Sequence, residues 1–112
     1  MDPTLDDFDK FVRVLARFSV AGLVVHLTAA PGKVTNEHGA EAVARMLRDA
    51  GLPENLMDEQ LSQRLLRLGG RDRFAMVWDA EIKEACKPLP PELLVLAAGR
   101  FTAARAWRQA MY

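Results

Sequence analysis

The sequence has few of the residues that small domains use for disulfide bonds, metal binding or catalysis. One cysteine, Cys86, excludes an intramolecular disulfide and a cysteine-rich zinc site. The two histidines, His26 and His38, lack a second ligand at the spacing that metal sites require. A phosphate-binding glycine loop and a nucleotide-binding glycine fingerprint are also missing. We therefore expect no catalytic residues, no metal and no cofactor, and an enzyme is the least favoured of the hypotheses considered below.

The sequence also lacks an excess of charge of either sign. Lysine and arginine number 15, and aspartate and glutamate also number 15. A net charge of zero gives no overall field that steers the protein to nucleic acid or to a membrane. The acidic residues that follow Met1 are the wrong charge for a secretory signal peptide, and the uncharged run 18–32 is too short for a membrane span. We expect no membrane partner and a cytoplasmic location, which the lone cysteine also suits.

Apolar residues recur with a period of 3.6 along most of the chain, which predicts amphipathic helices. A chain of 112 residues can bury a core without disulfides or metal ions. We therefore predict an all-α fold, a single-domain bundle of about five helices over residues 1–112. Residues 20–28 also fit a short strand, because Val24 and Val25 are β-branched, but no second strand is predicted and we favour a helix. Candidate core residues in mid-stripe are Leu15, Leu47, Leu65 and Trp78.

Caps, prolines and glycines divide the chain into helices. The first is predicted to be capped by Asp2 and to run through Leu27, and the second to run from Thr35 or Asn36 to Gly51. The third is predicted to be capped by Asn55 and to end at Gly69-Gly70; the fourth, from about Asp72, ends before Pro88. The last is predicted to open at Pro90-Pro91-Glu92 and to continue to the end of the chain.

Two uncharged stretches, 18–30 and 93–99, are the most informative feature of the sequence. A helix that is apolar all round must be covered on all sides, either by its own domain or by a partner. The last helix adds large anchors and small residues that suit a protein interface. Its role as the central helix of the monomer is an equal alternative. The predicted interface residues are Phe101, Ala103, Trp107, Met111 and Tyr112.

Arginines gather in the second half of the chain and suggest a different surface. If their helices lie side by side, they form a basic patch that can bind phosphate or carboxylate groups, because the guanidinium fork matches both. The alternative is a solvated face whose arginine stems cover apolar surface. The turn at Gly51 also permits a helix-turn-helix, although Glu54, Asp58 and Glu59 would then meet DNA phosphates. The candidate nucleic-acid-binding residues are Arg64, Arg67, Arg71, Arg73, Arg100, Arg105 and Arg108.

These patterns favour a non-enzymatic helical domain that binds a protein partner or a second copy of itself. Such domains serve as assembly subunits, adaptors or inhibitors, including ones that phages and other mobile elements encode. The alternative hypothesis is a nucleic-acid-binding protein, or a small subunit of a nucleoprotein complex, that uses the arginine patch.

Overall fold

The computed structural model describes residues 3–28 and 36–111, with their side chains except at 25–28, 36–40, 57, 59, 104 and 109–111. These residues form an all-α fold, as predicted, and none of them lies in a strand. The elements are α1 (Leu5–Thr28), α2 (Asn36–Asp49), a short 3₁₀ helix η1 (Glu54–Met57), α3 (Glu59–Cys86), α4 (Pro91–Arg100) and α5 (Ala103–Met111).

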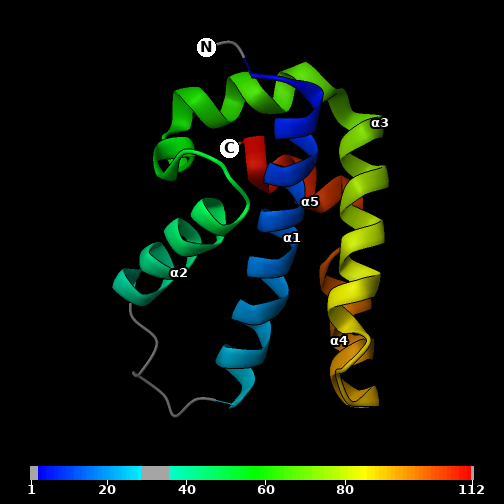
Figure 1. Cartoon of the computed structure of the whole chain (residues 1–112). Coiled ribbons are helices and arrows are strands. Elements are labelled where there is room, and N and C mark those ends of the chain that lie inside the picture. The colour runs from blue at the N-terminus through cyan, green and yellow to red at the C-terminus, as the bar shows by residue number, and fades with distance from the viewer. Residues whose placement is uncertain (1–2, 29–35, 112) are drawn as a thin grey trace.

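The first helix is the centre of the arrangement. In Figure 1, α1 runs between α2 on one side and the second half of α3 on the other. The first half of α3 crosses above it, and α5 packs against α3. α4 packs against the C-terminal half of α1, at one edge of the molecule. Every other long element therefore contacts α1 or α3.

The start of α1 is fixed by a capping box. The Thr4 hydroxyl accepts a hydrogen bond from the amide of Asp7 at 3.1 Å, and the Asp7 carboxylate accepts one from the amide of Thr4 at 3.0 Å. Asp2, the predicted cap, lies outside the described residues. From Leu5 the helix continues without a break through Gly22 to Thr28, so the strand considered at 20–28 does not form.

The turn between α2 and α3 begins as the sequence predicts. Gly51 has a positive φ of 78°. Its amide donates a hydrogen bond to the carbonyl of Arg48, and the amide of Leu52 donates one to the carbonyl of Leu47. This is the Schellman arrangement, which needs a glycine in the left-handed conformation. The cap of α3 differs from the prediction: η1 follows the turn, and Asp58, not Asn55, accepts hydrogen bonds from the amides of Gln60 and Leu61.

The two glycines at 69 and 70 separate α3 into two straight segments, at the place where the sequence predicts the end of a helix. Gly70 has φ 81° and ψ 174°, a conformation that only glycine adopts at low energy. The backbone bends here, so that residues 59–69 cross the top of α1 and residues 71–86 run alongside it (Figure 1). This bend allows one helix to cover two sides of α1.

The prediction of one continuous last helix is wrong. α4 ends at Arg100, Phe101 and Thr102 are not helical, and α5 begins at Ala103. The carbonyl of Phe101 leaves the helical ladder and accepts a hydrogen bond from the indole Nε1 of Trp78 at 3.3 Å. A buried indole N–H requires such a partner, and this tertiary contact outweighs the helical propensity of the segment.

The core lies between α1, α2, α3 and α5. Leu47, Leu65 and Trp78 are buried, as predicted, and Leu15 is partly buried against them. Phe74 stacks on Trp78, with ring centroids 5.5 Å apart. A second, smaller cluster connects α4 to the rest of the protein through the buried residues Val20, Leu23, Cys86 and Ala97.

Candidate functional site

The helix α4 exposes large apolar side chains that the described residues leave uncovered. Val95 is 73% exposed, Leu96 50% and Leu94 39%. Consecutive residues on a helix point about 100° apart, so these three side chains together cover most of its outer half. On the opposite side, Ala97 is fully buried and attaches α4 to α1. A contiguous apolar surface of this kind is typical of a binding site, whereas single exposed apolar residues are ordinary.

Small residues lie between these apolar side chains. Ala98 and Gly99 are exposed, and a Cβ placed on Gly99 would meet no other atom within 4 Å. Glycine inside a helix costs about 1 kcal/mol relative to alanine. Neither packing within the described chain nor a positive φ accounts for glycine at this position. A missing side chain on an exposed helix face lets a second backbone approach closely.

An acidic residue lies near one end of this surface and a basic residue near the other. Glu92 lies in the first turn of α4 and Arg100 in the last, and both are exposed. Each has the sign that the helix dipole favours at its end. Neither forms an ion pair with a side chain that the structure describes. We call the exposed set Glu92, Leu94, Val95, Leu96, Ala98, Gly99 and Arg100 the α4 face.

The predicted interface residues lie beyond this face, from the break at Phe101 onward. Phe101, Ala103 and Trp107 are partly buried and pack against the main core. The ring of Trp107 meets that of Phe74 edge to face, with centroids 5.1 Å apart. Met111 is the last residue of α5, but its side chain is outside the described set, and Tyr112 lies outside the described residues. An interface role for these five residues stays a prediction.

The uncharged run 93–99 was the sequence signal for the α4 face. It indicated a helix covered on all sides, and the structure covers only one side of it within the described residues. Periodicity could not predict which side, because the run is apolar at every angle.

The candidate arginines are distributed over three helices. Arg64, Arg67 and Arg71 are exposed on α3, Arg100 on α4, and Arg105 and Arg108 on α5. Within the part of the chain whose side chains are described, these six form no ion pair. α3 and α5 contact one another, as a shared patch requires.

Arg73 differs from the other candidates because it has a partner. Its Nε and Nη2 atoms donate to the two carboxylate oxygens of Asp9, each at 2.8 Å. The hydrogen bond from Arg73 lowers the pKa of Asp9 below its usual value of 3.8. This bidentate pair joins α1 to the second half of α3, and it gives Arg73 a structural role in the monomer.

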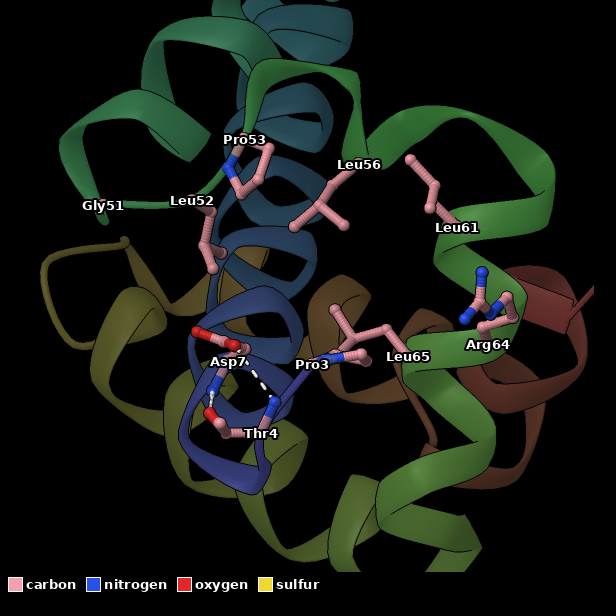
Figure 2. Close-up of a pocket in the computed structure, with 10 residues that line it drawn as sticks. All are labelled: Pro3, Thr4, Asp7, Gly51, Leu52, Pro53, Leu56, Leu61, Arg64 and Leu65. Carbon is pink, nitrogen blue, oxygen red and sulfur yellow. Dashed lines mark hydrogen bonds between the residues drawn. The ribbon is translucent and has the colours of Figure 1, made fainter. Parts of the chain in front are cut away.

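A cleft of about 390 Å³ lies at the other end of the molecule, between the start of α1, the Gly51–Pro53 turn and the start of α3 (Figure 2). Its volume is in the range of small-molecule sites. The carboxylate of Asp7 is already engaged in the cap of α1, so Arg64 is the charged group left for a ligand. The lining residues are Pro3, Thr4, Asp7, Gly51, Leu52, Pro53, Leu56, Leu61, Arg64 and Leu65.

The lone cysteine and the two histidines were the residues weighed for catalytic or metal chemistry. Cys86 is buried, and burial raises the pKa of its thiol, which is the reverse of what a nucleophile needs. The side chains of His26 and His38 are outside the described set. A search of the described part of the chain finds no group of three His, Cys, Asp or Glu side chains that could hold a metal ion.

Comparisons with known proteins give no relative. No family model, no curated protein and no solved structure matches the chain. Among the described residues, no helix is long and apolar enough to cross a membrane. The site must therefore be interpreted from its own chemistry.

Proposed function

We propose that this protein is a non-enzymatic helical interaction domain that binds a helix of a protein partner through the α4 face. The observation that carries the proposal is the row of three exposed large apolar residues, Leu94, Val95 and Leu96, beside a glycine with open space around it. Covering such side chains stabilises a complex by about 25 cal/mol per Å² of apolar area removed from water.

The shape and charge of the face favour a helix as the partner. Ala98 and Gly99 let a second helix approach at the short end of the 8–10 Å range of interaxial distances. Leu94 and Leu96 would then flank its apolar side. Glu92 and Arg100 favour a basic residue near one end of the partner helix and an acidic residue near the other. We place this activity in the cytoplasm, because a chain with a single cysteine suits a reducing compartment.

Site-specific photo-crosslinking in the cells that naturally make the protein tests this proposal. A photoreactive phenylalanine analogue at Val95 should give one defined protein adduct, which disappears when Leu94→Glu is added. The same analogue at Met76 is the matched control, because Met76 is 63% exposed on α3 and lies outside the α4 face. No adduct from Val95, or equal adducts from both positions, would refute the proposal.

The unpaired arginines favour a second candidate, a nucleic-acid-binding protein. Six exposed guanidinium groups on α3, α4 and α5 without carboxylate partners among the described side chains supply the charge that phosphate contacts require. Binding to a duplex should then weaken steeply with salt, and Arg67→Gln and Arg105→Gln should each reduce the slope. Val95→Glu should leave this binding intact, which separates the two candidates.

A further inference from the structure

We infer that the helix bound by the α4 face is α4 of a second copy of this chain, packed antiparallel across a two-fold axis near Val95 and Leu96. This inference rests on the proposed function and names its partner. A helix that fits the α4 face needs apolar residues in its middle and a small residue where the two helices approach. It also needs a basic residue opposite Glu92 and an acidic residue opposite Arg100. α4 itself has that pattern.

The charges match under the two-fold operation. Glu92 and Arg100 are eight positions apart, so their midpoint is residue 96. An antiparallel copy whose axis passes residue 96 places each Glu92 level with Arg100 of the other copy. An axis at residue 95 separates Glu92 and the Arg100 of the other copy by two residues along the helices, or about 3 Å at 1.5 Å per residue. An arginine side chain can span this distance. Two equivalent ion pairs therefore form, as an isologous interface requires.

The sizes of the side chains match as well. With the axis at residue 96, Leu94 stands opposite Ala98 of the other copy, and Ala98 opposite Leu94. This is the alternation of large and small residues that lets two helices interdigitate. Gly99 removes the Cβ at the edge of the contact, and nothing within the described chain fills its place. Glycine at an exposed helix position is unfavourable in the monomer. In the dimer it allows the two α4 helices to approach closely.

Parallel packing fails on the same residues. It would place Glu92 beside Glu92 of the other copy and Arg100 beside Arg100, which are like charges at both ends of the contact. The antiparallel arrangement is therefore selected by repulsion as well as by attraction.

The size of α4 limits the strength of the pair. A helix of ten residues is about 15 Å long, and its contact is smaller than the roughly 800 Å² per partner of a standard interface. We expect a dimer that forms above the micromolar range and dissociates on dilution. Such a dimer suits a domain that exchanges partners or that assembles only where it is concentrated.

Charge reversal tests the geometry directly. Sedimentation equilibrium of the full chain from micromolar to millimolar concentration should show a monomer–dimer equilibrium. Glu92→Arg alone and Arg100→Glu alone should each raise the dissociation constant about tenfold, since each replaces two attractive pairs by two repulsive ones. The double variant Glu92→Arg/Arg100→Glu should return it to within about threefold of the original. Single variants as tight as the original chain, or a double variant as weak as the singles, would overturn the arrangement.

A second measurement does not depend on these charges, whose reversal also removes favourable contacts with the helix dipole. A short bis-maleimide reagent should join two Leu96→Cys chains, because residue 96 meets itself near the axis, and should not join Met76→Cys chains. Equal cross-linking of both variants would overturn the inference. If the chain stays monomeric to millimolar concentration while the Val95 adduct contains a different protein, the second copy is excluded and the proposed function stands. If the chain stays monomeric and Val95 gives no adduct, both fail.

Discussion

Gly69 lies directly against the aromatic ring of Phe8, so closely that a Cβ on Gly69 would occupy the space of three ring atoms. Phe8 is fully buried in the core. The crossing of α3 over the start of α1 therefore depends on a missing side chain. The next residue, Gly70, supplies the conformation that turns the chain. The two neighbouring glycines thus have different tasks, one steric and one conformational.

Replacing Gly69 by alanine should destabilise the protein by about 1–3 kcal/mol, because the added methyl group overpacks the contact with Phe8. Urea unfolding followed by circular dichroism measures the change. Gly99→Ala is the matched control: its Cβ meets open space inside α4, and it should stabilise the monomer by about 0.5–1 kcal/mol. Equal effects of the two substitutions would contradict the packing described at Gly69.

Alanine at the buried leucines Leu47 and Leu65 should each cost about 2–5 kcal/mol, the usual loss for a truncated core leucine. Leu68 lies on the same helix as Leu65 and is 45% exposed, so Leu68→Ala should cost much less. The free energy of unfolding from denaturant melts gives all three values. A loss below about half a kilocalorie at Leu47 or Leu65 would mean that the core is misassigned.

The ion pair between Asp9 and Arg73 should make stability depend on pH in the acid range. Because the folded state lowers the pKa of Asp9, this contribution is complete above the ordinary value of 3.8 and is lost as the pH falls through the lowered value. The difference in unfolding free energy between the original chain and Asp9→Asn should therefore shrink below that pH. A difference that stays constant down to about pH 2 would show that the carboxylate gains nothing from Arg73.

Trp107 should contribute to the stability of the monomer, because its ring packs on Phe74. Trp107→Ala should lower the free energy of unfolding by about 2 kcal/mol, less than a fully buried tryptophan loses. Val95→Ala should change it by less than about half a kilocalorie, since Val95 contacts mainly solvent in the monomer. If Trp107→Ala is neutral while it abolishes association, then α5, and not α4, carries the interface.

Much of the fold could be predicted from local signals. The ends of α2 and of the first half of α3 coincide with Gly51 and Gly69-Gly70, because glycine is the residue that those backbone conformations require. Caps were harder to predict. Asp2, Thr4, Asn55 and Asp58 are all suitable N-cap residues, and the choice between them depends on where the chain leaves the preceding turn.

The break between α4 and α5 could not be predicted from the residues near it. Neither residue of the break, Phe101 or Thr102, is a glycine or a proline. The break is stabilised by a hydrogen bond from Trp78, which lies far away in the sequence. For the same reason the sequence placed the candidate interface residues after residue 100. In the structure Phe101 and Trp107 pack on the core, whereas Leu94 to Leu96, which were not among the predicted interface residues, face outward. Which side of an apolar run is covered is decided by tertiary packing, not by the run itself.

A concentration series of two-dimensional ¹H–¹⁵N NMR spectra tests the central claim most directly, because it reports every backbone amide of the full chain at once. Between micromolar and millimolar protein, the α4 face predicts progressive shifts confined to residues 91–100 and their immediate neighbours, and Val95→Glu should abolish them. Shifts that instead centre on α5 or on the exposed arginines of α3, or an α4 whose amides do not respond, would contradict the pairing of α4 with a second copy of the chain.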